Sequence, residues 1–163
     1  MQKCVYTPIM QDQERQPDLP AGSEAVQFCA CFNLRKTTRA ITQFYNAILQ
    51  PSGLLATQFN LLVILARDNP TPISALADAL GMDRTTLARN LKPLQRDGLV
   101  QVAPDEQDRR IQLVALTFSG RERLLAALPL WQQAQQQILA QFGADRFTAL
   151  LADLSSMVAL TQT

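Results

Sequence analysis

Two helical patterns joined by Gly81-Met82-Asp83 constrain this chain more than any other feature of its sequence. Glycine readily ends a helix because it adopts a left-handed conformation, and an aspartate two residues later is a strong helix N-cap. We therefore expect one helix over residues 74–80 and a second helix that begins at Arg84. Two helices joined in this way form a helix-turn-helix.

The second of these helices has two chemically different sides. Leu87, Leu91 and Leu94 recur at the spacing of one helical stripe, which we expect to face the core. The opposite side is basic and polar and comprises Arg84, Thr85, Ala88, Arg89 and Lys92, with Thr86 and Asn90 at its margin. A helix in the major groove of DNA needs both sides, because it must hold the core and also present cations and hydroxyls to phosphates and base edges. Taken alone, an ordinary amphipathic surface helix explains the pattern equally well.

A predicted β-hairpin follows and favours the DNA-binding interpretation. Residues 99–103 and 111–116 are short, apolar and rich enough in β-branched residues to be strands. The loop between them, "PDEQDRR", ends in Arg109 and Arg110. Asp108 can pair with one arginine and fix its direction, which leaves the other free to enter a minor groove. The alternative is a solvated loop whose charges pair with each other. A helix-turn-helix followed by such a ribbon is a winged helix, so we expect a mainly α fold with a small β-hairpin.

The rest of the chain is predicted to be helical after a polar N-terminal arm. Helical spacing covers residues 24–49, 58–67, 118–141 and 145–160, with Thr57 and Thr117 as candidate N-caps. The last helix has an apolar face too broad for a lone terminal helix, so burying that face requires a partner. We expect a flexible arm at 1–23, a dimerisation helix at 24–53, a winged helix-turn-helix DNA-binding region at 54–116 and C-terminal dimerisation helices at 117–163.

Length and charge narrow the class of protein. A chain of 163 residues that is 47% hydrophobic and 18% charged fits one soluble globular domain. We find no apolar run of membrane-spanning length and no signal-peptide pattern, so we expect a cytoplasmic protein without membrane contact. Because the formal net charge is only +1, an anionic partner must be met by a local basic patch.

The chain has no histidine and three cysteines, Cys4, Cys29 and Cys31. Their odd number argues against a disulfide framework, and zinc lacks its usual four ligands. The absence of histidine also removes the commonest general base. We therefore expect no catalytic residue, no metal and no cofactor, and a protein that is not an enzyme. A winged-helix module that binds another protein instead of DNA is the alternative.

Three motifs in order, "LQRDGLV", "DEQDRR" and "LTFSG", resemble the MarR/SlyA family of bacterial winged-helix transcription regulators. The likeness spans about residues 24–160. It implies an obligate homodimer on double-stranded DNA with a palindromic operator, in which a wing arginine enters the minor groove. The candidate DNA-binding residues are Ser74, Arg84, Thr85, Thr86, Arg89, Asn90, Lys92, Asp108, Arg109 and Arg110. Family members commonly repress transcription, and they release DNA when a small phenolic ligand binds between the DNA-binding and dimer regions or when a cysteine is oxidised.

The stretch "CFNLRKTTRAITQFY" resembles the first helix of the organic-hydroperoxide-sensing branch of this family. The matching residues are Cys31, Phe32, Arg39 and Tyr45, whereas Arg35 stands where that branch has a tyrosine. A position near a helix N-terminus and one turn from Arg35 favours a reactive thiol at Cys31. Cys31, with Cys29 beside it, is therefore a candidate redox-sensing residue that a peroxide would oxidise.

The sequence allows alternatives for the burial of the cysteines and for their disulfide partners. Cys29 and Cys31 could instead be small buried apolar residues. On a helix these two residues point in different directions, so a direct disulfide between them needs local unwinding. Cys4 on the arm, or a cysteine of the other subunit, is the freer partner.

Overall fold

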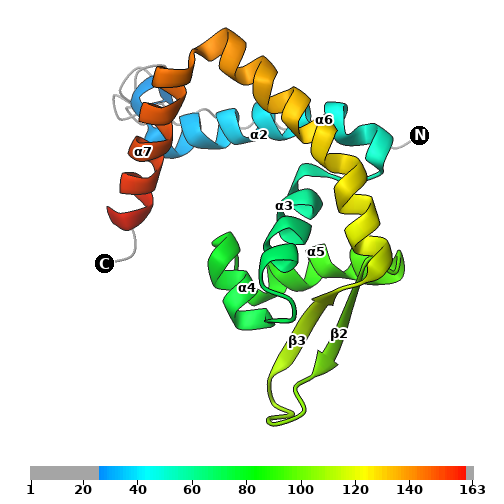
Figure 1. Ribbon diagram of the computed structural model, residues 1–163. Coiled ribbons are helices and arrows are strands. Elements are labelled where there is room, and N and C mark those ends of the chain that lie inside the picture. Colours follow the sequence, from blue (N-terminus) through cyan, green and yellow to red (C-terminus); the bar gives the residue numbers. More distant parts are fainter. Residues whose placement is uncertain (1–25, 161–163) are drawn as a thin grey trace, which may run out of the picture. The chain divides into compact units, whose positions relative to one another are not determined.

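The computed structural model of the protein describes residues 26–160, so the predicted arm at residues 1–23 lies outside the described part of the chain. The described elements are helices and one small sheet (Figure 1). They are α2 (Ala30–Leu49), the 3-10 turn η1 (Gln50–Ser52), α3 (Ala56–Arg67), β1 (Thr71–Pro72), α4 (Ile73–Leu80), α5 (Arg84–Arg96), β2 (Val100–Pro104), β3 (Gln112–Leu116), α6 (Phe118–Phe142) and α7 (Ala144–Leu160). The described part of the chain divides into two units, with the boundary between Arg39 and Ala40 inside α2.

The helix-turn-helix is present as predicted. Gly81 ends α4 with a φ of 60°, and the N–H of Met82 donates to the carbonyl of Ala77 at 2.9 Å. Asp83 then caps α5, because its carboxylate accepts the N–H of Thr86 at 2.9 Å. Each connection satisfies backbone groups that a helix end leaves without a partner. Hydrogen bonds between residues close in the sequence therefore form the turn.

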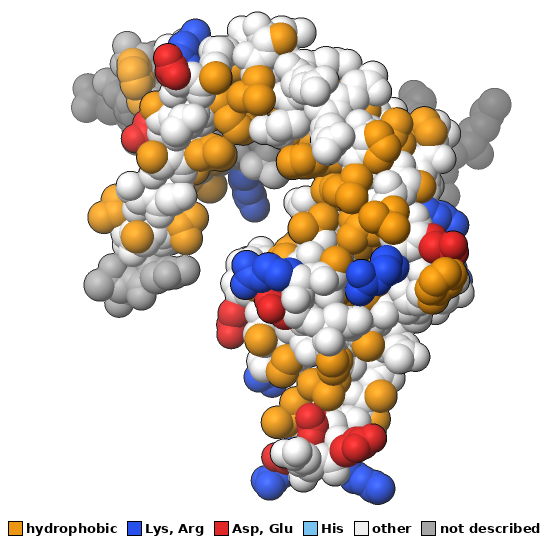
Figure 2. Space-filling view, in the orientation of Figure 1, with side chains coloured by type: hydrophobic (Ala, Val, Ile, Leu, Met, Phe, Trp, Pro, Cys, Tyr) orange, Lys and Arg blue, Asp and Glu red, His pale blue; other side chains and the backbone are white. Residues whose placement is uncertain are grey.

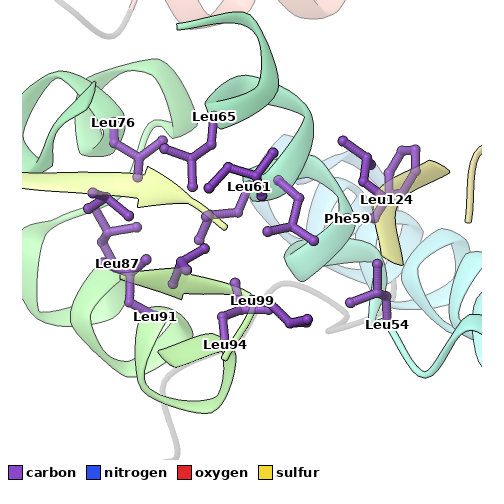
Figure 3. Packing of buried hydrophobic residues seen from close by; sticks show 14 of the residues in the cluster. Leu54, Phe59, Leu61, Leu65, Leu76, Leu87, Leu91, Leu94, Leu99 and Leu124 are labelled. Carbon is purple, nitrogen blue, oxygen red and sulfur yellow. The ribbon is translucent and has the colours of Figure 1, made fainter. Parts of the chain in front are cut away.

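The leucine stripe of α5 anchors this helix in the core. Leu87, Leu91 and Leu94 are 0%, 2% and 0% exposed. They point toward leucines of α3 and α4 and toward Leu99 at the start of the wing (Figure 3). Burial of a leucine side chain stabilises a fold by roughly 1.5–3 kcal/mol, so the stripe holds α5 firmly by one side.

The sheet has three antiparallel strands in the order β1-β3-β2. The hairpin is confirmed, with Val102 opposite Val114, although both strands begin one residue later than predicted. The third strand, β1, was not expected, because Pro70-Thr71-Pro72 looks like a turn. Thr71 instead pairs with Val114, and the side chain of Asn69 accepts the N–H of Leu116 at 2.9 Å. With β1 added, the architecture is the predicted winged helix (Figure 1).

The start of α6 lies against the connection between α5 and β2. Thr117 caps α6 by accepting the N–H of Gly120 at 3.0 Å, and its own hydroxyl donates to the carbonyl of Gly98 at 2.7 Å. A Cβ atom at Gly120 would overlap the carbonyl oxygen of Leu99 and lie 2.7 Å from a methyl of Leu116. The motif "LTFSG" therefore supplies the cap and the clearance that let α6 pack here.

Two helix starts differ from the prediction. Residues 26–28 are helical but Cys29 is not, so the continuous helix expected from residue 24 is wrong at this point, and α2 begins at Ala30. The side-chain amide of Asn33 donates to the carbonyls of Gln27 at 2.8 Å and Cys29 at 3.0 Å. These hydrogen bonds satisfy carbonyl groups that the break exposes.

The second difference concerns α3, which begins at Ala56 with Leu55 as its N-cap. Thr57 is therefore inside the helix and is not its cap. Gln58 accepts the N–H of Leu55 at 2.9 Å, and Asn46 of α2 accepts the N–H of Ala56 at 2.7 Å. A cap supplied by another helix has no signal in the local sequence.

The C-terminal helix α7 keeps its apolar side chains at the surface of this single chain. None of its residues is buried, and Leu150, Leu151 and Met157 are 38%, 48% and 37% exposed. Among the described residues, no single helix is long and apolar enough to cross a membrane. One bent pair of helices, Ala30–Ser52 with Ala56–Arg67, meets the requirement by length and composition only.

Candidate nucleic-acid interface

The side of α5 opposite the leucine stripe is an exposed polar surface. Arg84, Thr85, Arg89 and Lys92 are all exposed. Within residues 26–160, none of the three cations among them forms an ion pair. Their charges are thus available to an external anion, as a surface that binds phosphate requires.

Two predicted residues at the margin of this surface also have structural contacts. The hydroxyl of Thr86 donates to Asp83 at 2.6 Å, and the amide of the half-buried Asn90 donates to the sulfur of Met82 at 3.5 Å. Thr86 keeps its methyl group and oxygen lone pairs for another partner. Asn90 has less freedom, because its amide would have to leave Met82 before it could contact a base.

The cap residue Asp83 is held in its charged form. The hydrogen bonds donated by the side chain and backbone of Thr86 hold the pKa of Asp83 below its ordinary value of 3.8. A carboxylate at a helix N-terminus also complements the helix dipole. The turn that positions α5 therefore depends on an ionised carboxylate.

Replacing Asp83 by alanine is expected to lower Tm at neutral pH, because Thr86 loses its acceptor. Because the pKa of Asp83 is lowered from 3.8, the stability that the carboxylate contributes is complete above that pH and is lost as the pH falls through the lowered pKa. The Tm difference between the wild type and Asp83→Ala should therefore shrink when thermal unfolding is measured at pH values progressively lower than 3.8.

Asp83→Asn is the matched control for this pH dependence. Asparagine caps a helix about as well as aspartate but does not titrate, so its advantage over alanine should not vary with pH. A wild-type advantage over Asp83→Ala that stays as constant below pH 3.8 as that of Asp83→Asn would contradict the role given to the ionised carboxylate.

Three predicted residues from separate elements meet in one surface hollow of about 240 Å³. Ser74 comes from the first turn of α4, Arg84 from the first turn of α5, and Arg110 from the wing loop. The hollow is lined further by Ile73, Ile111 and Gln112, which were not among the predicted residues. Two guanidinium groups and a hydroxyl beside a helix N-terminus are chemically suited to an anionic group such as phosphate.

The wing loop is ordered by its acidic residues. Asp105 accepts the N–H groups of Gln107 at 2.7 Å and Asp108 at 3.1 Å, which is an Asx-turn. Asp108 then forms an ion pair with Arg110 at 3.2 Å, so the expected pairing with one arginine is confirmed. Among the described residues no ion pair involves Arg109. Figure 2 shows basic side chains at the end of the hairpin with acidic ones behind them.

Asp105 holds the wing loop by two hydrogen bonds but was not among the residues predicted from the sequence. Its signal was present, since an aspartate that begins a polar loop commonly forms an Asx-turn. Because the ion pair between Asp108 and Arg110 is exposed, it stabilises the fold little. Its effect is to direct the side chain of Arg110.

A second candidate site is a cavity of about 260 Å³ between α2, α3 and α6. It is lined by Ile41, Thr42, Tyr45, Ala56, Phe59, Asn60 and Trp131. The rings of Phe59 and Trp131 are stacked, with centroids 6.0 Å apart and 16° between their planes. The hydroxyl of Tyr45 donates to Gln135 at 2.6 Å, and burial raises the pKa of Tyr45, so the phenol stays protonated. Of these residues, only Tyr45 was singled out from the sequence.

The positions of Cys29 and Cys31, at the start of α2, contradict one of the two interpretations of these cysteines. Cys29 and Cys31 are free thiols and both are exposed, so the alternative that they are buried core residues is wrong for this chain. Cys29 sits at the break before α2, where its sulfur lies 3.5 Å from the N–H of Phe32. Cys4 lies outside the described residues.

Comparison with known proteins identifies the family. The chain matches the family model described as MarR family over residues 54–112. It is 30% identical over 125 residues to the transcriptional repressor NicR of Pseudomonas putida, an alignment that covers 77% of this chain and 79% of NicR. The chain belongs to the MarR family. The matched segment contains α3, α4, α5 and β2, which include the exposed side of α5 described above.

Two further relatives extend this comparison of the MarR-family chain. The transcriptional regulator MosR of M. tuberculosis, solved in complex with DNA, is 37% identical, with a TM-score of 0.73 over 83% of this chain and 99% of MosR. The organic hydroperoxide resistance transcriptional regulator of Bacillus subtilis is 28% identical over 90 residues, which is 55% of this chain and 61% of that protein. These MarR-family relatives are transcriptional regulators and not enzymes, and this chain has their winged-helix fold.

Proposed function

We propose that this MarR-family regulator is a repressor that binds a palindromic operator as a homodimer. The observation that carries the proposal is the exposed cationic side of α5, whose Arg84 shares a hollow with Arg110 of the wing. The candidate contacts are Ser74, Arg84, Thr85, Thr86, Arg89, Asn90 and Lys92 in the major groove, and Asp108, Arg109 and Arg110 at the minor groove. The name of NicR as a repressor and the DNA complex of MosR support this assignment.

Within the wing, Asp108 has a positioning role in the proposal. A bare carboxylate repels phosphate, but here it is 3.2 Å from the guanidinium of Arg110. The ion pair aims Arg110 and lowers the repulsion at the same time. The cation of Arg109 remains for the phosphates that border a narrow minor groove, where arginine is favoured.

The homodimer is proposed to form through residues 24–53 and 117–163, which leaves 54–116 to bind DNA. The support is the apolar surface of α7, where Leu150, Leu151 and Met157 are each more than one third exposed. An apolar helical face of this kind commonly marks a contact between proteins. A two-fold dimer presents two copies of α5, and a palindromic site has the same symmetry.

The test is the affinity for duplex DNA from the region upstream of the protein's own gene, with a scrambled duplex of equal length as control. If six or more phosphates are neutralised per dimer, the Kd should weaken by roughly 10³-fold or more between about 50 and 200 mM salt. Light scattering of the same samples should give a mass of two chains. An affinity that hardly changes with salt, or full binding by a monomer, would overturn the proposal.

We propose in addition that an effector releases the DNA, either a small phenolic molecule or a peroxide. The cavity between α2, α3 and α6 supports the first route, since it lies beside the helix that packs on α5. The exposure of Cys29 and Cys31 and the similarity to a hydroperoxide resistance regulator support the second. In that route the hydroperoxide oxidises a thiolate to sulfenic acid and is itself reduced to an alcohol.

Fluorescence anisotropy of labelled duplex separates the two routes. Peroxide should release DNA from the wild type but not from Cys31→Ser, and Cys29→Ser is the matched variant two residues away. If peroxide still releases DNA from Cys31→Ser, oxidation of this residue is not the signal.

A further inference from the structure

We infer that the cavity between α2, α3 and α6 selects an uncharged, flat aromatic molecule and discriminates against aromatic carboxylates. The inference rests on the proposed function, which makes this cavity the effector site. It adds the chemical class of the ligand, which the proposed function leaves open between charged and neutral phenolic compounds.

The charge of the cavity lining favours a neutral ligand. The described residues that line the cavity are all uncharged, and they are Ile41, Thr42, Tyr45, Ala56, Phe59, Asn60 and Trp131. A carboxylate that enters such a site loses part of its hydration, and none of these lining residues supplies a cation in return. Because burial raises the pKa of Tyr45, its phenol is neutral as well. A neutral ring loses little hydration on entry, so the balance favours it.

The shape of the cavity favours a flat ligand. Phe59 and Trp131 stack almost parallel, at 16°, and bring planar apolar side chains to the cavity from two different helices. Aromatic rings prefer offset stacking on such a surface. The volume of about 260 Å³ is below the range of sites for drug-sized molecules, which begins near 300 Å³. The cavity therefore suits a molecule of one or two rings.

The polar atoms of the lining can orient a neutral ring. Thr42, Tyr45 and Asn60 bring two hydroxyls and one amide to the lining. The proton of Tyr45 is engaged, because its hydroxyl donates to Gln135 at 2.6 Å. Its oxygen can still accept a hydrogen bond, and the amide of Asn60 can both donate and accept. An amide, phenol or lactam on the ligand matches these groups without any net charge.

The cavity is also connected to the helix that carries the DNA-binding residues. Ala56, Phe59 and Asn60 line the cavity from α3, and the same helix buries Leu61 and Leu65 in the core. The leucines of α5 pack in that core (Figure 3). A ligand that displaces α3 would therefore move the packing surface of α5.

The test compares benzamide with benzoate, which share a ring and nearly the same size but differ in charge at neutral pH. Trp131 is the only tryptophan of the chain, so its fluorescence reports on the cavity in the full-length protein. Benzamide should bind at least about tenfold more tightly than benzoate and should be the more effective in releasing the upstream duplex.

A gain-of-function variant keeps the inference falsifiable. Asn60 lines the cavity and is exposed, so Asn60→Arg adds a cation at the rim without disturbing the core. Because Asn60→Arg adds a cation and removes the amide, it should raise the affinity for benzoate relative to that for benzamide by at least about tenfold, whereas the neutral control Asn60→Gln, which keeps an amide, should leave this ratio unchanged.

The outcomes separate this inference from the proposed function. If benzoate binds the wild type as tightly as benzamide and releases DNA, the cavity is an effector site but the charge selection is wrong. If neither compound changes the fluorescence of Trp131 or the DNA complex, both the selection and the effector site are wrong. DNA binding itself is measured independently by its salt dependence.

Discussion

Replacing Gly120 by alanine is expected to lower the free energy of unfolding by about 3 kcal/mol and Tm by roughly 6–12 °C. The new Cβ would overlap the carbonyl oxygen of Leu99 and lie 2.7 Å from a methyl of Leu116. The carbonyl cannot move freely, because it accepts the N–H of Thr117 at 3.1 Å. The gain of about 1 kcal/mol in helix propensity that alanine brings over glycine is smaller than this overpacking.

Thermal and denaturant unfolding of Gly120→Ala measure this effect, and Ser119→Ala is the matched control. Ser119 is the preceding residue of the same helical turn and is exposed, so its replacement should change stability by no more than about 0.5 kcal/mol. If Gly120→Ala unfolds at the wild-type Tm, then α6 does not pack against Leu99 as described. The orientation of the wing would then have to depend on contacts other than the one between α6 and Leu99.

The double variant Arg84→Ala, Arg89→Ala is expected to lose at least about 10²-fold in affinity for the upstream duplex. A good arginine contact to a guanine is worth roughly 1–3 kcal/mol, and a dimer would lose each contact twice. Both side chains are exposed and make no ion pair with a described residue, so the fold should not change. The slope of log Kd against log salt should fall as well.

Arg96→Ala is the control on the same helix. Arg96 lies in the last turn of α5 and pairs with Asp97 at 3.0 Å, so its replacement should change DNA affinity little. Circular dichroism of both variants should match the wild type. A double variant that keeps its affinity for DNA would mean that this side of α5 is not the contact, and that the winged helix serves a protein partner instead.

The parts of the fold that were predictable have local causes. Gly81 and Asp83 determine the turn, whose hydrogen bonds span no more than five positions along the chain. The leucine stripe of α5 was predictable because any helix that packs on a core has apolar residues at this spacing. The pairing of Asp108 with a neighbouring arginine depends on two positions of separation. These interactions join residues that are close in the sequence, so they can be recognised from the sequence alone.

The parts that were missed depend on residues far apart. Strand β1 exists because β3 lies beside it, and Thr71 has no strand signal of its own between two prolines. The start of α3 is capped by Asn46 from another helix. The break at Cys29 was hidden because the apolar spacing continues across it. A helix can stop and restart within a periodic pattern when a side chain such as that of Asn33 satisfies the exposed carbonyls.

By itself the sequence determined the helix-turn-helix, the charged side of α5, the basic wing and the family to which these motifs belong. Only the tertiary structure decided that Ser74, Arg84 and Arg110 line one hollow, and that uncharged side chains of α2, α3 and α6 line one cavity. The physical reason is the separation along the chain of the residues that interact. Caps, turns and stripes are encoded by neighbours along the chain, whereas a hollow or a cavity exists only where packing brings distant side chains together.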